Sequence, residues 1–234
     1  GQDLIDASDL STRSLIDLRP GAYSTIGEET DNIAVAAAVR QDGAVINFIE
    51  DAWGGSAKDR IIGNNADNDL RGGGARDVIR GGRGSDEIAG EGGNDRLFGN
   101  GGADLMQGGR GKDRMNGGGG GDELSGNGGR DILKGRNGSD LLDGGGGNDL
   151  LIGGGGGDSF VFSRGDDRVR DFSTSRSGEV IDLSGVAAFT GFSDVMTNHA
   201  SDEAEGVMIR DLTGNSMLLE GLTMSELSAD DFLF

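Results

Sequence analysis

Carboxylates recur at a fixed interval through the middle of the chain. From position 59 to position 158 an aspartate stands at every ninth residue, and Asn68 is the one exception. The eleven aspartates are Asp59, Asp77, Asp86, Asp95, Asp104, Asp113, Asp122, Asp131, Asp140, Asp149 and Asp158. Carboxylates are the ligands that hard divalent cations prefer in proteins. The pattern therefore predicts a row of cation sites, with the aspartates as ligands.

Each aspartate is the sixth residue of a nine-residue unit that repeats twelve times from Gly54 to Val161 without insertion or deletion. Five units read in full as Gly-Gly-x-Gly-x-Asp-x-apolar-x. Glycines at the first, second and fourth places allow positive φ and close backbone approach, which predicts a tight turn whose carbonyl oxygens point inward. The last three residues of each unit predict a short strand, because their middle residue is apolar in all twelve units.

With two units per coil, equivalent residues lie 18 positions apart and stack. This arrangement predicts an all-β chain, namely a right-handed parallel β-roll with an N-terminal and a C-terminal β cap. Residues 1–53 are the predicted β-rich lead-in, 54–161 the roll and 162–234 the C-terminal cap. One core column is expected to contain Ile61, Ile79, Leu97, Met115, Leu133 and Leu151, and the other Leu70, Ile88, Met106, Leu124, Leu142 and Phe160.

Stacked turns would lie about 4.8 Å apart, so their oxygens meet in the gap between coils. Calcium suits such a cage better than magnesium, which demands near-ideal octahedral geometry. Carbonyl ligands are expected from turn residues such as Gly81, Gly84, Gly90, Gly99, Gly108, Gly111, Gly117, Gly120, Gly144 and Gly153. We expect about eight ions and about ten as the ceiling, because sites that use Asn68, or Asp59 beside Ala57, should be weak.

The formal charge of −20, from 41 acids and 21 bases, argues against a nucleic-acid partner. Eight to ten calcium ions would bring the filled roll close to neutrality, and without them facing aspartates repel. The metal-free chain is therefore predicted to be largely unfolded. No apolar run of about 18 residues predicts a membrane span. Because the chain starts at Gly1 without a leader, we expect that an N-terminal part has been removed or that the chain is a fragment.

Several details of the C-terminal part carry expectations. Ile132, Leu141, Leu150 and Ile152 would form an exposed apolar strip, so the C-terminal segment is predicted to fold back over the last coils. Gly214-Asn215 predicts a hairpin turn. An exposed acidic loop is the favoured interpretation of Asp166, Asp167 and Asp171, and one more ion is the alternative.

Catalysis by this chain is not expected. There is no His-Glu-x-x-His pattern, and the single histidine, His199, lies in a polar stretch typical of a surface loop. The chain has no cysteine and one histidine, so it offers few residues for nucleophilic catalysis of the Ser-His or Cys-His type. A glycosidase-like pair of carboxylates is the one catalytic alternative that the sequence leaves open, since carboxylates are plentiful.

The Gly-Gly-x-Gly-x-Asp repeats resemble those of the RTX, or hemolysin-type, proteins. That resemblance implies a calcium-binding parallel β-roll and type I secretion from bacteria to the extracellular space. The segments Asp3–Ser8, Ile16–Leu18 and Pro20–Ser24 look like the lead-in of serralysin-type metalloproteases. In the family, an ending such as Asp231, Phe232, Leu233 and Phe234 belongs to an uncleaved signal for the type I secretion machinery; a last strand on the cap is a compatible interpretation.

Two functions follow as expectations. The first is a calcium-dependent folding and secretion module attached to an N-terminal domain, with a serralysin-like zinc protease as the parent enzyme. The alternative is a self-standing extracellular adhesion or glycan-binding protein that uses the surface of the roll.

Overall fold

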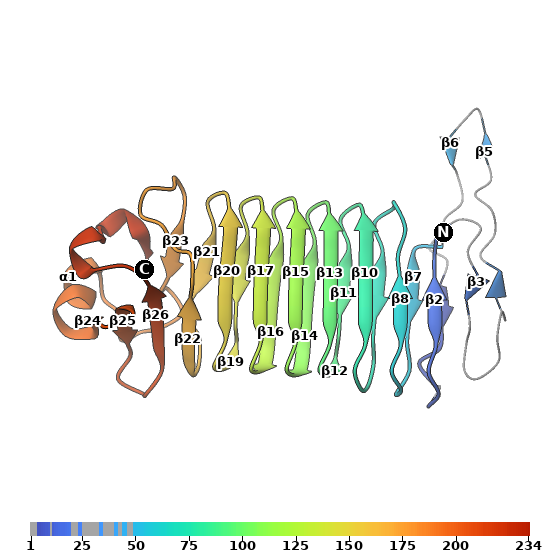
Figure 1. Cartoon of the computed structure of the whole chain (residues 1–234), viewed down its shortest axis with the longest axis horizontal. Helices are drawn as coiled ribbons and strands as arrows, with labels where there is room; N and C mark the ends of the chain where they lie inside the picture. The colour runs from blue at the N-terminus through green and yellow to red at the C-terminus, as the bar shows by residue number, and fades with distance from the viewer. Residues whose placement is uncertain are drawn as a thin grey trace.

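The chain forms an elongated roll with its N-terminal coils at one end and the C-terminal cap at the other (Figure 1). The computed structural model describes residues 4–9, 11–19, 23–24, 33–34, 40–41, 44–45 and 49–234. Two long sheets face each other along the roll, and successive strands alternate between them. The predicted all-β parallel roll is confirmed.

Sheet A has twelve strands. In spatial order its main path is β1 (Leu4–Asp6), β7 (Asp51–Trp53), β9 (Asp69–Arg71), β11 (Glu87–Ala89), β14 (Leu105–Gly111), β16 (Glu123–Gly129), β18 (Leu141–Asp143), β21 (Ser159–Val161), β23 (Val180–Asp182) and β27 (Phe232–Leu233). Two short strands, β12 (Gly92–Gly93) and β19 (Gly146–Gly147), pair with β14 and β16.

Sheet B has eleven strands. Its order is β2 (Leu15–Asp17), β8 (Arg60–Ile62), β10 (Val78–Arg83), β13 (Arg96–Gly101), β15 (Arg114–Gly119), β17 (Ile132–Asn137), β20 (Leu150–Gly155), β22 (Asp166–Val169), β26 (Ser216–Glu220), β25 (Gly206–Arg210) and β24 (Ala200–Glu203). Two small antiparallel pairs, β3 (Tyr23–Ser24) with β4 (Ile33–Ala34) and β5 (Arg40–Gln41) with β6 (Ala44–Val45), belong to the lead-in.

The register of the sheets confirms the predicted core columns. Leu97 pairs with Met115 in sheet B, and Met106 pairs with Leu124 in sheet A, each 18 residues apart. Every residue of the two columns is at most 1% exposed. Because the strand alternates its side chains, the residues on either side of each column member face outward.

Coils of the same form continue beyond residues 54–161 in both directions. Ile16 stacks on Ile61 and Ala52 on Leu70 at the N-terminal end. At the C-terminal end Val169 stacks on Leu151. Ile181 stacks on Phe160, and Phe232 in turn on Ile181. The stack of coils therefore extends into the lead-in at one end and into the C-terminal cap at the other.

The C-terminal cap adds short helices to this stack. They are α1 (Phe192–Asp194), a π-helix (Val195–His199) and two 3₁₀ helices (Met224–Glu226 and Ala229–Asp231). The predicted hairpin is confirmed, since β25 and β26 pair antiparallel around Gly214. No helix in the described part of the chain is long and apolar enough to cross a membrane.

Two expectations about the cap are wrong. Ile132, Leu141, Leu150 and Ile152 are half-buried, but the C-terminal segment extends both sheets at the end of the roll instead of lying back across these residues. Stacking a new coil on the last strands satisfies their backbone groups, which a segment laid across the face would not do. His199 is not a surface residue: it is 8% exposed, packs edge-on against Phe189 and shares a 2.8 Å hydrogen bond through Nδ1 with the Arg210 carbonyl oxygen.

Candidate metal centre

The repeated aspartates form two buried ladders, one along each edge of the roll. Units that lead into sheet B place their turns at one edge, and units that lead into sheet A place theirs at the other. All eleven predicted aspartates and Asn68 are brought into these ladders, and none is more than 3% exposed. A buried carboxylate without compensation is costly, so the oxygens of each aspartate need partners.

One oxygen of each ladder aspartate has a partner in the preceding coil. The N–H of Asp77 donates to Asp95 Oδ1 at 2.7 Å, and the N–H of Asp104 donates to Asp122 Oδ1 at 3.0 Å. This contact repeats along both edges from Asp59 to Asp167 at 2.7–3.0 Å. The Oδ1 atoms therefore fix the stacking of the turns.

The second oxygen is different. In the described structure, ten ladder aspartates have a buried Oδ2 with no hydrogen-bond partner. They are Asp77, Asp86, Asp95, Asp104, Asp113, Asp122, Asp131, Asp140, Asp149 and Asp158. Buried polar atoms are rarely left unpaired in folded proteins. A regular column of them indicates a ligand that the protein does not itself supply.

The first glycine of each unit keeps open the space into which this oxygen points. A Cβ atom on Gly90 would lie 2.7 Å from Asp95 Oδ2 and 2.6 Å from the Gly108 carbonyl oxygen of the next coil. On Gly99 it would lie 2.1 Å from Asp104 Oδ2 and 2.6 Å from the Gly117 carbonyl oxygen. A carboxylate and a carbonyl oxygen from adjacent coils thus converge beside a glycine, at a position where any larger residue would crowd both oxygens.

Among the predicted carbonyl ligands, several lie in this position. The carbonyl oxygens of Gly81, Gly90, Gly99, Gly108, Gly117 and Gly144 face the first glycine of the preceding coil. Those of Gly84, Gly111 and Gly120 instead lie against the fourth residue of the following coil. For Gly153 the close contact is that of an added Cβ atom, which would lie 2.2 Å from Asp158 Oδ2 of the same unit.

The donor set consists of oxygen atoms. No three carboxylate, histidine or cysteine side chains of the described residues gather at one point, so a bound ion would depend on backbone carbonyls as well as aspartates. Carboxylate and carbonyl oxygens in a flexible backbone cage are the ligands of calcium. The residues present therefore fit a hard divalent cation.

Electrostatics supports the same conclusion. Burial raises the pKa of Asp77 to about 8 and that of Asp86, Asp95 and Asp131 to about 7, although backbone hydrogen bonds oppose the rise. Neighbouring ladder carboxylates raise these pKa values further. A cation between the coils would favour the charged form and offset both effects.

The ends of the ladders depart from this pattern. Asp59 Oδ2 accepts a 2.8 Å hydrogen bond from the N–H of Gly55. Asn68 offers an amide, and its Nδ2 is buried without a partner in the described structure. Both features agree with the expectation that the first coil binds calcium most weakly.

Two carboxylates continue the ladders beyond the predicted set: Asp167, which sequence reasoning included only in the alternative of one more ion, and Glu179, which it missed. Asp167, expected in an exposed loop, is 2% exposed and accepts a 3.0 Å hydrogen bond from the N–H of Asp149, exactly as a thirteenth unit would. The exposed-loop interpretation is wrong for this residue, although Asp166 is exposed. Gly165, Asp167 and Val169 keep the fourth, sixth and eighth places of the unit, which was the signal available in the sequence.

Glu179 takes the same place above Asp158. It stands two residues before the core residue Ile181, its side chain is fully buried, and its Oε1 has no partner among the described residues. Its Oε2 is 3.3 Å from Arg176 Nη1. Asp171, which is half-buried, accepts hydrogen bonds of 2.9 Å from the N–H groups of Gly153 and Gly154.

Comparison with known proteins agrees with the geometry. The family model of the RTX calcium-binding nonapeptide repeat matches four times, at residues 53–88, 89–124, 125–160 and 134–169. No curated protein matches the chain. Thirty-three chains of solved structures match. One is the crystal structure of extracellular lipase LipA from Serratia marcescens, with a TM-score of 0.41 and 17% identity over 76% of this chain.

The present chain spans 40% of the length of that lipase chain, and at this TM-score the likeness adds nothing to the assignment. The family matches carry it, because together they cover residues 53–169, half of the 234 residues, and coincide with the coils that bear the two ladders. The chain therefore belongs to the RTX calcium-binding nonapeptide repeat family.

Proposed function

We propose that calcium binds in the gaps between successive turns along both edges of the roll and that this binding drives folding of the chain. The column of ten buried Oδ2 atoms without a protein partner is the observation that carries the proposal. One coil supplies a carboxylate and the next supplies a carbonyl oxygen, across a space kept open by glycine, beside Gly72, Gly81, Gly90, Gly99, Gly108 and Gly126. Bound calcium would supply the positive charge that these oxygens lack.

The proposed sites are those of Asp77 to Asp158, with Asp59 and Asn68 as the weak end. The predicted array holds about eight ions, with about ten as its ceiling. Asp167 and Glu179 extend the proposal by one gap at each edge. A metal-free roll would hold rows of buried carboxylates close together, so its folding depends on the ion.

Calcium dependence suggests where the chain folds. Extracellular calcium modules bind with dissociation constants of about 10⁻⁴ to 10⁻³ M, well above resting cytosolic calcium. The chain would then stay unfolded and exportable in the cell and fold outside. We propose that it is the extracellular, non-catalytic C-terminal module of a secreted bacterial protein and stabilises an attached N-terminal domain, with a serralysin-like protease as the candidate. The coding sequence upstream of Gly1 tests the attachment: a zinc-binding helix supports it, and a nearby start codon contradicts it.

The terminal residues are proposed as the type I secretion signal. In the folded chain Asp231 and Phe232 are buried, and β27 pairs with β23, whereas Leu233 and Phe234 are each 47% exposed. Deletion of residues 231–234 should abolish export. The truncated chain should still bind calcium when purified, because the ladders lie elsewhere. Full export of the truncated chain would contradict the signal role.

Calcium stoichiometry tests the binding proposal. Equilibrium dialysis of the purified chain against calcium should give about eight or more ions per chain, with much weaker uptake of magnesium. A chain that takes up one or two ions, or magnesium equally well, would overturn the proposal.

A further inference from the structure

The two outer faces of the roll carry opposite charge. The residues that decide this charge are the fifth, seventh and ninth of each unit, because they lie on either side of the ladder aspartate at the sixth place and the core residue at the eighth. In the coils that lead into sheet B these places hold eleven bases and one acid, Asp166. The bases are Lys58, Arg60, Arg76, Arg80, Arg96, Lys112, Arg114, Arg130, Lys134, Arg168 and Arg170. We call this surface the basic face.

The same places on the sheet A side carry the reverse pattern. They hold five acids and one base, Arg71, which pairs with Asp69 at 2.9 Å. A chain with a formal charge of −20 thus collects half of its bases on one face of one sheet. Strand pairing at 18-residue intervals aligns them from coil to coil, at about 4.8 Å per coil. The result is three parallel columns in which bases recur, each interrupted by neutral residues such as Asn94, Ile132 and Phe98.

Most of the basic face is not neutralised by the protein. Its ion pairs lie at the C-terminal end, where Arg168 pairs with Glu205 and Glu220, and Arg170 with Glu220. From Arg60 to Lys134, no base of this face pairs with a carboxylate within the described part of the chain. Most of these side chains are exposed.

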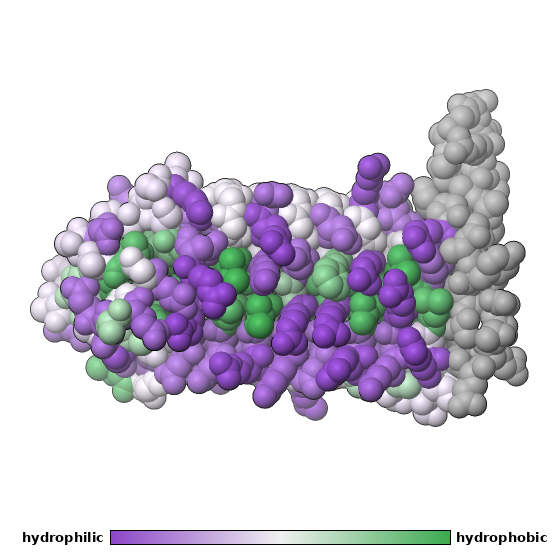
Figure 2. All heavy atoms as spheres, in the orientation of Figure 1, coloured by the Kyte–Doolittle hydropathy of each residue, from purple (hydrophilic) through white to green (hydrophobic). Residues whose placement is uncertain are grey.

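A hollow of about 890 Å³ runs along this face at the edge of the turns. Lys112, Arg114 and Arg130 line it together with the amides Asn94 and Asn148. Figure 2 shows hydrophilic residues along this edge, beside a narrower line of apolar residues along the middle of the sheet. We propose that the hollow binds a linear anionic polysaccharide, with its sulfate or carboxylate groups on the bases and its hydroxyl groups on the amides.

Two other polyanions fit less well. Single-stranded nucleic acid needs aromatic platforms for base stacking. The one aromatic residue of the basic face, Phe98, is covered by the Arg80 guanidinium, 4.7 Å from its ring centre. An anionic membrane favours exposed large apolar residues beside the bases. In the described chain these residues are Leu4, Leu212, Leu233 and Phe234, and none lies on the basic face, where the apolar residues Ile132 and Leu150 of the hollow are half-buried.

Calcium would gate this binding, and this part of the inference rests on the proposed function. Five carboxylates line the same hollow as the bases, namely the ladder residues Asp113, Asp131, Asp149 and Asp167 and the exposed Asp166. In the metal-free chain their charge opposes an approaching polyanion. Ions in the gaps would cancel the charge of the four ladder carboxylates and leave the bases in excess over Asp166, in addition to folding the coils that align them.

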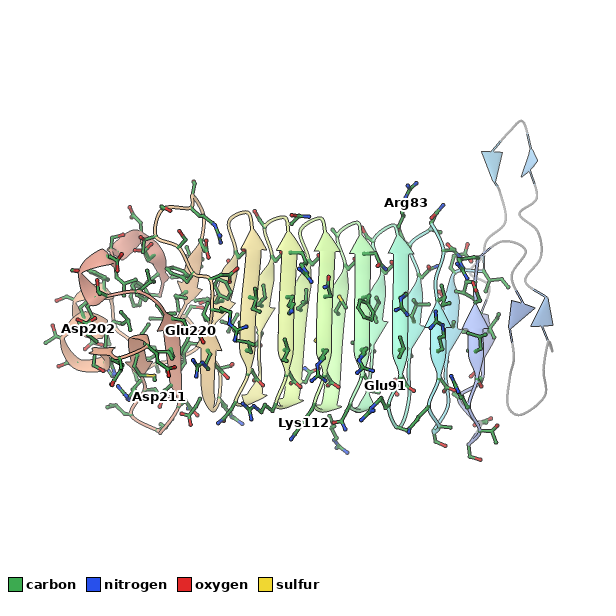
Figure 3. All side chains as sticks on the ribbon, in the orientation of Figure 1. Arg83, Glu91, Lys112, Asp202, Asp211 and Glu220 are labelled. Atoms are coloured by element: carbon green, nitrogen blue, oxygen red, sulfur yellow. The ribbon has the colours of Figure 1, made fainter. Side chains whose placement is uncertain are left out.

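The test compares two matched double variants in saturating calcium. Arg114→Gln with Arg130→Gln removes two exposed bases that line the hollow. The control, Arg83→Gln with Arg136→Gln, removes two exposed bases at the C-terminal ends of β10 and β17 that do not line the hollow. Figure 3 shows Arg83 at one edge of the roll and Lys112, a residue of the hollow, at the other. Far-UV circular dichroism against calcium confirms that both variants fold as the parent does.

Binding is measured by titration calorimetry with dextran sulfate, with neutral dextran as the blank. The parent and the control pair should bind, with affinity falling as salt rises. The basic-face pair should bind about 2- to 30-fold more weakly, the range for two exposed ion pairs. Equal loss in both variants, no binding by the calcium-loaded parent, or equal affinity for single-stranded DNA or phosphatidylserine vesicles would overturn the inference. A chain that fails to bind calcium at all would instead overturn the proposed function.

Discussion

The interior turns and the end turns of the ladders use the same residue in different ways. In an interior turn such as that of Asp104, one carboxylate oxygen holds the preceding coil and the other is buried without a protein partner. At the N-terminal end, Asp59 Oδ2 accepts from the N–H of Gly55. At the C-terminal end, Asp167 Oδ2 accepts from Ser163 Oγ at 3.0 Å. The end turns thus satisfy their own aspartates.

This difference shows that the two carboxylate oxygens have separate roles: Oδ1 holds the stacked coils together, and Oδ2 is the atom that lacks a protein partner in the interior turns. Stacking needs only Oδ1, which is bonded at the ends and in the interior alike. A partner for Oδ2 is missing only in the interior of the described ladders. We infer that the Asp59 and Asp167 turns are able to hold their shape without metal and that the interior turns are not. Each prediction below sets an interior position against an end position or against a matched site elsewhere.

The largest effect is expected from filling the space beside the first glycine of an interior unit, where the aspartate Oδ2 and the carbonyl oxygen of the next coil converge. In Gly99→Ala the new methyl group would lie 2.1 Å from Asp104 Oδ2 and 2.6 Å from the Gly117 carbonyl oxygen. Overpacking of this kind costs about 1 to 3 kcal/mol, and the loss of the adjoining ion adds to it. Guanidinium unfolding in saturating calcium measures the sum. Gly185→Ala is the control, because no atom lies within 4 Å of its Cβ, and it should be close to neutral.

Removing a charge should affect the interior more than the end. Asp113→Asn is expected to raise the calcium midpoint of folding by about tenfold, corresponding to about 1.4 kcal/mol, because it removes the charge of a carboxylate whose Oδ2 has no partner among the described residues. Asp59→Asn should shift the midpoint much less, since Gly55 already uses its second oxygen. Calcium titrations followed by circular dichroism compare the two, and equal shifts would remove the distinction between interior and end.

The converse substitution should turn an end turn into an interior one. Asn68→Asp replaces the amide that stands alone in the ladders and creates a further calcium gap next to Asp86. At a calcium concentration about ten times the dissociation constant of that gap, the gain in stability should be about 1.4 kcal/mol. In EGTA the variant should be no more stable than the parent. One additional ion in equilibrium dialysis is the direct readout; an unchanged count would contradict the prediction.

The smallest effect is expected where the cap joins the roll. Glu179→Gln should remove one ion next to Asp158 and cost less than about 1 kcal/mol, because half-exposed Arg176 already interacts with the other oxygen of Glu179. Glu123→Gln, an exposed residue on the outer face of sheet A, should change neither the ion count nor stability. If both variants keep the parent ion count, Glu179 is not part of the ladder.

The repeat made most of the architecture predictable from sequence. Twelve units in phase fix which residues stack, and so the two core columns and the burial of the aspartates follow from the period alone. Asp167 was misplaced because its unit begins with Phe162 and Ser163 in place of two glycines, although its later residues keep phase. The phase of Gly165, Asp167 and Val169 was the better guide than the missing glycines.

Other features depend on contacts that no period encodes. Glu179 lies 21 residues after Asp158 rather than 18, so the longer connection hides its equivalence until Ile181 is seen to stack on Phe160. His199 has polar neighbours in sequence, and only the packing of Phe189 and the Arg210 carbonyl group buries it. The basic face became visible once the alternation between sheets had been assigned, because bases and acids are mixed along the chain.

The central claim is that calcium completes the interior turns and thereby folds the roll. Far-UV circular dichroism of the purified chain in EGTA, and then in excess calcium, tests it most directly. We predict a largely unfolded spectrum in EGTA and a β-type spectrum in calcium, with a midpoint at about 10⁻⁴ to 10⁻³ M. A β-type spectrum that is the same in EGTA and in calcium would contradict the account.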